Sequence, residues 1–172
     1  EFHDAALPEV RKLLQSPFHE ERLLALLVLV RQYERSDGPG RSAIYALYLR
    51  NVRSINNWDL VDLTAPHIVG AHLMKRSRKP LYGLARSKDL WKRRIAILAT
   101  FRFIQDGQFD DALAIAKRLL DDEEDLIHKA VGWMLREVGK RDQRVLEAFL
   151  REHAPSMPRT MLRYAIERFP EN

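Results

Sequence analysis

Trp58 and Asp62 have the residue types and the spacing that could support chemistry. They lie four positions apart in the segment 56–63, which has the pattern of a helix opening, so their side chains share one helical face. An indole attracts cations through its π face, and a carboxylate attracts them through its charge. The pair therefore predicts a site that receives a group that is both flat and cationic.

The composition of the chain limits what can surround this pair. The chain has 172 residues, of which 46% are apolar, and these values predict one globular domain, residues 1–172, with a continuous core. Lys and Arg outnumber Asp and Glu by 29 to 24, for a formal net charge of +5. This balance favours an anionic partner such as nucleic acid or a membrane surface. The chain has no cysteine, which excludes disulfides, thiol nucleophiles and thiolate metal sites.

Apolar runs in the sequence are too short to cross a membrane. The run from Leu23 to Val30 is bounded by Arg22 and Arg31, whereas a spanning helix needs roughly 18 apolar residues or more. No signal peptide is visible. We therefore expect a soluble, cytoplasmic protein, with nucleic acid and no membrane as its partner.

The spacing of apolar residues predicts helices along almost the whole chain. Apolar residues recur three and four positions apart, with breaks at Pro, Gly, Asn or Asp, and no segment has the alternating pattern of a strand. The fold class is therefore predicted to be all-α. The expected helices are Leu7–Gln15, Glu20–Arg35, Arg41–Val52, Trp58–Met74, Leu81–Arg86, Leu90–Asp106, Phe109–Leu120, Asp125–Gly139, Asp142–His153 and Pro158–Phe169.

Four of the longer helices share a repeated pattern. The aligned pairs are Arg22 with Ala25, Asp59 with Asp62, Arg93 with Ala96, and Lys129 with Gly132. Successive pairs begin 37, 34 and 36 residues apart, a period that fits two-helix repeats of the HEAT or tetratricopeptide type. Since the tetratricopeptide signature is absent, we predict a HEAT-like solenoid (an α-α superhelix) with a concave basic face.

The alignment places a carboxylate, Asp62, where the other repeats hold Ala or Gly. An ionised group that faces a neighbouring helix is costly unless it is paired or hydrated, and this favours a functional role for Asp62. The alternative is a surface residue or a helix-end cap.

Three motifs together resemble the AlkD-like DNA alkylation repair glycosylases, which are HEAT-like repeat DNA glycosylases. The motifs are Asn56-Asn57-Trp58-Asp59-Leu60-Val61-Asp62, the segment Leu90–Leu98 and the segment Lys129–Glu137. The resemblance covers residues 16–169. Family members carry further helices upstream, so we expect part of the DNA-binding surface to precede this segment.

The resemblance implies an enzyme that hydrolyses the N-glycosidic bond of cationic N3- or N7-alkylated purines in duplex DNA and leaves an abasic site. Asp62 then matches the catalytic carboxylate, Trp58 and Trp133 contact the lesion and its sugar, and Arg94 contacts a backbone phosphate. The damaged base is expected to stay stacked, in contrast to most glycosylases. We expect the enzyme to act as a monomer.

The chemistry of such a substrate agrees with these residue types. An alkylated purine already carries a positive charge and leaves as a neutral base, so the reaction needs no general acid. It needs negative charge beside C1′ and a positioned water, and the Asp62 carboxylate can supply both if it is ionised at neutral pH, as we expect. A unit charge about 4 Å away is worth about 4 kcal/mol at an effective dielectric of ~20, or roughly a thousandfold in rate.

Lys and Arg side chains are candidates for phosphate contacts. Arg93 precedes Arg94 on a helix whose other face is apolar, and the cluster between helices contains Lys75, Arg76, Arg78 and Lys79. Such cations bind DNA through charge and counterion release. The alternative for the cluster is a solvated loop.

The three tryptophans and one glycine also have structural explanations. Trp91 is expected to pack in the core, and Trp58 and Trp133 could equally do so. Gly132 would allow another backbone to approach closely, at a functional contact or in ordinary helix packing.

Other kinds of chemistry find little support in the sequence. His67 and His72 are five residues apart and diverge on a helix, so no metal site is expected. The sequence has no glycine-rich phosphate loop, and we expect no cofactor. The competing hypothesis is a HEAT-like scaffold that binds DNA or a protein without catalysis.

Overall fold

The computed structural model describes residues 5–169, and within this range the chain is helical, with no strand. The helices are α1 (Leu7–Leu14), α2 (His19–Arg35), α3 (Gly38–Arg50), α4 (Trp58–Asp62), α5 (Ala71–Leu73), α6 (Lys79–Ala85), α7 (Leu90–Ala99), α8 (Phe101–Gln105), α9 (Asp110–Arg118), α10 (Asp125–Gly139), α11 (Gln143–His153) and α12 (Arg159–Ile166). Short 3₁₀ turns cover Val52–Ser54 and Ala154–Ser156, and a π turn covers Pro66–Gly70.

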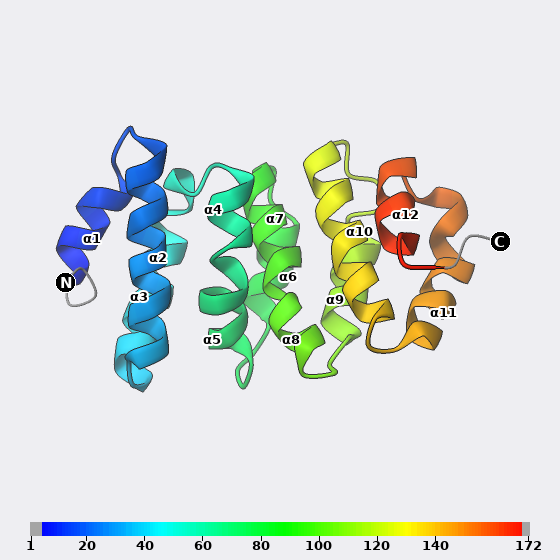
Figure 1. Cartoon of the computed structure of the whole chain (residues 1–172), viewed down its shortest axis with the longest axis horizontal. Helices are drawn as coiled ribbons and strands as arrows, with labels where there is room; N and C mark the ends of the chain where they lie inside the picture. The colour runs from blue at the N-terminus through cyan, green and yellow to red at the C-terminus, as the bar shows by residue number, and fades with distance from the viewer. Residues whose placement is uncertain (1–4, 170–172) are drawn as a thin grey trace.

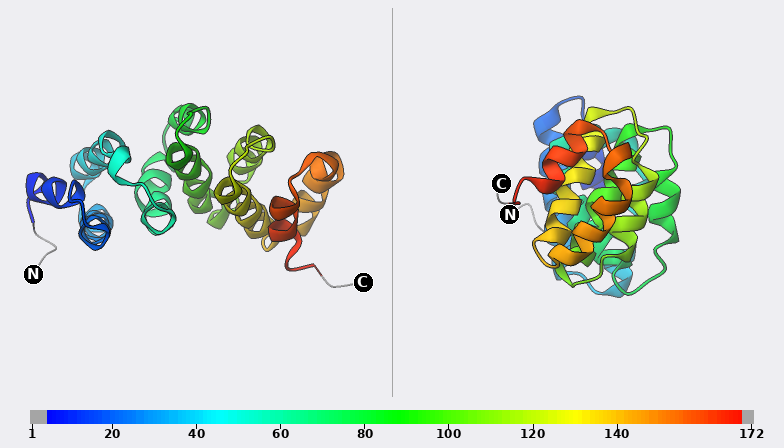
Figure 2. Two further views of the ribbon diagram at one scale, coloured as in Figure 1. Left: turned by 90° about the horizontal axis from the view of Figure 1, so that it is seen from above. Right: turned by 90° about the vertical axis from the view of Figure 1, so that its right-hand side faces the viewer.

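The helices are stacked along one long axis in chain order (Figure 1). Seen from above, they form two rows in a gentle arch, with α3, α6, α9 and α11 on the convex side (Figure 2, left). The row on the opposite side, called the inner row here, consists of α2, α4 with α5, α7 with α8, α10 and α12, and successive members contact one another. The all-α helical-repeat prediction is confirmed.

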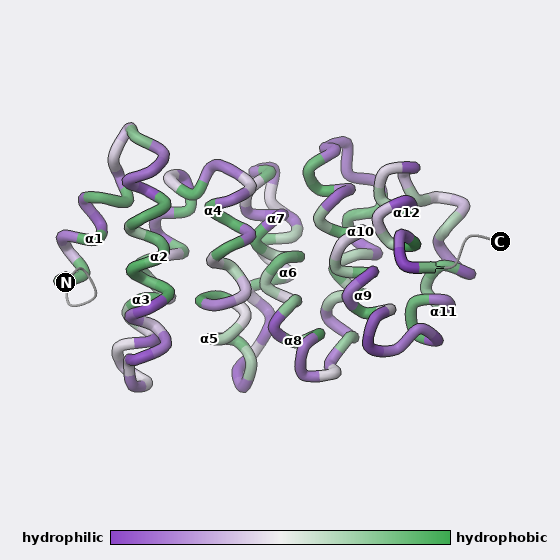
Figure 3. The backbone as a smooth tube through the Cα atoms, in the orientation of Figure 1, coloured by the Kyte–Doolittle hydropathy of each residue, from purple (hydrophilic) through white to green (hydrophobic). Residues whose placement is uncertain are grey.

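The core lies between the two rows. Apolar residues of both rows form one buried cluster along the chain, while several turns at the helix ends are hydrophilic (purple in Figure 3). Trp91 packs against this cluster, as expected. No helix among the described residues has the length and apolar character needed to cross a lipid bilayer.

Aspartate caps set where several helices begin. The side chain of Asp37 accepts a hydrogen bond from the Gly40 N–H at the start of α3, and Asp89 accepts from the Trp91 N–H at the start of α7. Asp142 caps α11 in the same way. Such caps satisfy N–H groups that have no partner inside the helix.

Two inner-row helices begin with the same arrangement of side chain and backbone. Arg22 donates hydrogen bonds to the carbonyls of residues 16 and 17, at 3.0 and 2.9 Å. Arg93 donates to those of residues 87 and 88, at 3.1 and 2.9 Å. These matching contacts show that the two arginines are equivalent in the repeat, as the alignment of the sequence predicts.

The single helix expected over Trp58–Met74 is wrong, because Pro66 interrupts it. Proline has no N–H to donate to the carbonyl of Asp62, four residues earlier, and its ring would clash with that carbonyl. The α4 helix therefore ends at Asp62, and the chain passes through the π turn before α5.

The helix expected over Leu90–Asp106 is also divided, at Thr100. The hydroxyl of Thr100 donates to the Ile97 carbonyl at 2.6 Å, a bond that competes with regular helix geometry. The other expected helices are present with ends shifted by three residues or fewer.

Two glycines allow inner-row helices to approach closely. A Cβ on Gly132 would lie 2.5 Å from the Met161 carbonyl oxygen, and one on Gly70 would lie 2.3 Å from that of Ala99. Gly132 thus serves helix packing. Gly70 makes a close contact of the same kind with the end of α7.

These contacts predict opposite effects for two glycine substitutions. Gly70→Ala should lower the free energy of unfolding by about 1–3 kcal/mol, because the added methyl meets backbone atoms. Gly83→Ala, in α6 with open space around its Cα, should raise it by about 0.5–1 kcal/mol. Urea denaturation of both variants measures the difference. Equal effects would contradict the close approach at Gly70.

Candidate functional site

Asp62 and Arg94 form a bidentate ion pair on the inner row. The Arg94 Nε donates to Asp62 Oδ1 at 2.8 Å, and its Nη2 donates to Oδ2 at 2.7 Å. Two parallel bonds from one guanidinium fix the orientation of a carboxylate as well as stabilising it. The carboxylate of Asp62 is therefore held in one position.

The ion pair joins three successive helices of the inner row. Asp62 is the last residue of α4, Arg94 belongs to α7, and the third guanidinium nitrogen of Arg94 donates to the carbonyl of Leu126 in the first turn of α10. The Asp62 side chain is 12% exposed and that of Arg94 is 6% exposed. The carboxylate is thus the more accessible member of the pair.

Burial and pairing act in opposite directions on Asp62. Burial raises the pKa of its carboxyl above the usual value, and the hydrogen bonds and charge of Arg94 offset only part of that rise. The nearby carboxylate of Asp59 adds to the rise. A group that must be ionised to act would therefore lose its charge at a higher pH than an ordinary aspartate does.

Trp58 lies one turn before Asp62 and is exposed. Its side chain belongs to the first residue of α4 and is 53% exposed. The helix start is fixed from both sides: Asn57 accepts from the Trp58 N–H at 2.8 Å, and Asp59 contacts the His19 ring at 2.7 Å across the gap to α2. Trp58 is therefore a surface aromatic on an anchored helix end, and not a core residue.

A buried carboxylate holds the indole of Trp133. The Trp133 N–H donates to Glu137 at 3.3 Å, and Glu137 also accepts from Lys140 and Arg141. Burial raises the pKa of Glu137, but the hydrogen bonds from Lys140 and Arg141 outweigh it and keep the pKa below its usual value. The ring of Phe101 lies 6.2 Å from the indole. Trp133 is thus partly buried and fixed by charged and aromatic neighbours.

Two of the predicted site residues contact each other in the structure, and the other two are placed only by the helices that carry them. Asp62 and Arg94 are in contact, and Trp58 shares a helix with Asp62. Trp133 contacts its own neighbours; it lies seven residues beyond Leu126 on α10, about 10 Å along the helix axis. The four residues therefore belong to three successive helices of the inner row, α4, α7 and α10.

Comparisons with known proteins identify the family of this chain and its fold. Residues 2–169 match a family described as DNA alkylation repair enzymes. The chain belongs to the DNA alkylation repair enzyme family. A solved structure, described as a predicted DNA alkylation repair enzyme from Enterococcus faecalis, superimposes with a TM-score of 0.74 at 17% identity, covering 99% of this chain and 80% of that one. A search of curated proteins gave no match.

Three predicted phosphate contacts of this DNA alkylation repair family member are already engaged within the protein. Arg94 is 5% exposed and bound to Asp62. Arg93 pairs with Asp122 at 2.6 Å, and Arg78 pairs with Asp111 at 2.5 Å. Each guanidinium thus pairs with a carboxylate on a neighbouring element in the unbound protein. The contacts of these three arginines with DNA phosphates stay a prediction.

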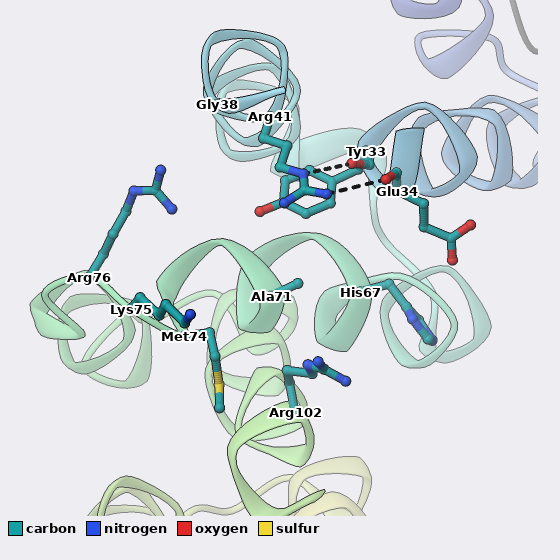
Figure 4. Close-up of a pocket in the computed structure, with 10 residues that line it drawn as sticks. All are labelled: Tyr33, Glu34, Gly38, Arg41, His67, Ala71, Met74, Lys75, Arg76 and Arg102. Carbon is teal, nitrogen blue, oxygen red and sulfur yellow. Dashed lines mark hydrogen bonds between the residues drawn. The ribbon is translucent and has the colours of Figure 1, made fainter. Parts of the chain in front are cut away.

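The rest of the predicted cation cluster is accessible. Lys75, Arg76 and Lys79 are exposed at the turn between α5 and α6. Lys75 and Arg76 also line a cavity that the sequence did not reveal, together with Arg41 and Arg102 (Figure 4). The four cations come from three separate segments of the chain, and only their individual charges were visible in the sequence.

The histidines contribute no metal site in the described part of the chain, where no group of three His, Asp or Glu side chains is placed to hold an ion. His72 is buried, with its ring stacked on Tyr45 at 4.1 Å, whereas His67 is exposed. The two rings diverge, as their five-residue spacing predicts.

The Asp62–Arg94 pair predicts a pH-dependent loss of stability when it is broken. Arg94→Gln should cost about 3–5 kcal/mol at neutral pH, because it leaves a buried carboxylate without its partner. Without Arg94 the pKa of Asp62 rises further, so the cost should grow as pH increases from ~4 to 7. Chemical denaturation at both pH values measures this.

The matched control for this prediction is an exposed ion pair. Lys117 and Glu152 lie 3.2 Å apart with side chains 61% and 66% exposed, so Lys117→Gln should cost no more than about 1 kcal/mol. A loss for Arg94→Gln that is as small as this, or that does not change with pH, would contradict the structural importance of the buried pair.

Proposed function

We propose that this chain is a DNA glycosylase that hydrolyses the N-glycosidic bond of cationic N3- or N7-alkylated purines in duplex DNA and leaves an abasic site. The observation that carries the proposal is the fixed carboxylate of Asp62, which is the more exposed member of its ion pair and lies one turn from an exposed indole. Membership of the DNA alkylation repair family supports the same chemistry. The proposed enzyme acts as a monomer.

Asp62 has the charge and hydrogen-bonding capacity that the reaction needs. As the bond to an alkylated purine breaks, positive charge moves from the base to the sugar, and a nearby carboxylate stabilises it. Each carboxylate oxygen can accept more than one hydrogen bond, so the oxygens bound by Arg94 can also orient a water molecule. Arg94 thereby positions the carboxylate, and Asp62 carries the electrostatic and water-orienting roles.

The two tryptophans fit roles in holding the lesion. Trp58 offers an accessible π surface next to Asp62, and a cation against an indole face gains about 0.5–2 kcal/mol. Trp133 presents an indole whose orientation Glu137 restrains. In this proposal both rings contact the lesion nucleotide, and neither takes part in bond breaking.

A DNA-binding scaffold without catalysis is the second candidate. The exposed cations at Lys75, Arg76 and Lys79 favour DNA binding whether or not a base is released. The scaffold hypothesis assigns no chemical task to Asp62, and only an assay of base release separates the two.

Asp62→Asn should lower the release of N7-methylguanine from duplex DNA by roughly a thousandfold, because it removes the stabilising charge. Binding to the same DNA should remain. The control is Asp121→Asn, which removes an exposed carboxylate from the turn after α9; it should release the base at the parent rate. Binding by the parent without any release would support the scaffold instead.

The raised pKa of Asp62 predicts the acid limb of the activity profile. The rate should fall as pH drops through that pKa, since only the ionised carboxylate stabilises the developing cation. The fall should therefore occur above the range of an ordinary aspartate, ~4. Single-turnover release measured across pH, with DNA binding checked at each value, tests this. A rate that stays constant down to pH ~4 would contradict a role for ionised Asp62.

A further inference from the structure

A second site lies beside α5, at the other end of the inner-row helix from Asp62. It is a cavity of about 520 Å³, and the name "Ala71 trough" is used for it here. Figure 4 shows Arg41 and Arg76 on one side of Ala71 and Arg102 on the other. Ala71 lies between these cations and has a short side chain, so it leaves space for a ligand between them.

The charges around the Ala71 trough are not neutralised within the protein. Arg41 donates to the backbone carbonyls of Tyr33 and Glu34, and Arg76 donates to a backbone carbonyl. In the described part of the chain, no ion pair with a carboxylate forms at Arg41, Arg76 or Arg102. The one carboxylate in the lining, that of Glu34, is paired with Arg31 at 3.0 Å. The trough is therefore strongly positive.

The distribution of these cations fits an extended anion better than a single ion. Lys75 adds a fourth cation to the lining, and the four come from α3, α8 and the turn after α5. Cations on both sides of a low floor can contact successive phosphates of one strand. The apolar part of the lining, which includes Met74, can contact sugars.

We propose that the Ala71 trough binds the sugar-phosphate backbone of DNA away from the lesion, as an anchor that does not depend on damage. The inference rests on the proposed function, which makes duplex DNA the substrate. Asp62 and Ala71 are nine residues apart with the π turn between them, and Asp62 is not part of the trough lining. The trough is therefore separate from the proposed lesion site.

Such an anchor has a distinct energetic signature. It contacts phosphates and not the damaged base, so it contributes equally to the binding of damaged and undamaged DNA. Removing it should raise KM without changing the rate of base release from bound DNA. Each lost phosphate contact should also reduce the salt dependence of binding, by about 0.9 in the slope of log K against log salt concentration.

The experiment compares Ala71→Glu with Ala71→Gln in the full chain. The two side chains are close in size, but only the first introduces a negative charge. Binding to an undamaged duplex is measured at several salt concentrations, and single-turnover release of N7-methylguanine is measured with saturating enzyme. Arg102→Gln removes one cation from the trough without altering its floor. Arg144→Gln removes an exposed cation from α11 on the convex side and is the control.

The proposal predicts at least tenfold weaker binding to undamaged DNA for Ala71→Glu than for Ala71→Gln. Arg102→Gln should reduce the salt slope by about 0.9, Arg144→Gln should leave it unchanged, and release from bound DNA should match the parent. Equal binding by the Glu and Gln variants, with a parental salt slope for Arg102→Gln, would overturn the inference even if the parent releases bases. If the parent releases no base but the trough variants bind DNA more weakly than the parent does, the glycosylase proposal is overturned and the anchor is supported.

Thermal unfolding of each variant checks that the fold is retained. If Ala71→Glu fails to fold, Arg102→Gln still decides the question, because its side chain is exposed on α8. A parental salt slope for that variant counts against the trough, and a reduced slope supports it.

Discussion

The structure of the candidate site depends on one buried ion pair. Arg94 reaches from α7 to Asp62 on α4 and to a backbone carbonyl on α10, so a single guanidinium connects three consecutive helices of the inner row. In a repeat fold each helix contacts mainly its neighbours, and few side chains bridge three of them. The same contact that aligns these helices fixes the direction of the carboxylate, so packing and the proposed chemistry share one interaction.

The break at Pro66 gives Asp62 its place at a helix end. Helix α4 is only five residues long and stops at Asp62, after which the chain widens into a π turn. Such π turns within helices often occur at functional sites. Here the break separates the Asp62 end of the helix from the Ala71 end, which faces a different set of charges.

The fold could be predicted from the sequence, but most charge partners in the candidate site could not. Apolar periodicity gives the helices, and the equivalent contacts of Arg22 and Arg93 show that the repeat is real. Arg94 was visible as a cation, yet its contact with Asp62 joins residues 32 positions apart. Arg78 finds Asp111 in the same long-range way. Charge counting cannot separate a guanidinium that stabilises the fold from one left free for a ligand.

The hydrogen bond from Trp133 to Glu137 affects the entropy that a ligand would lose on binding to this indole. By fixing the Trp133 indole before any encounter, it removes rotational freedom that an unrestrained ring would lose only on association. That entropic cost then falls on folding and not on binding, which is how preorganised surfaces gain affinity without additional contacts. A charged residue that no ligand needs to touch can thereby affect how tightly one is held.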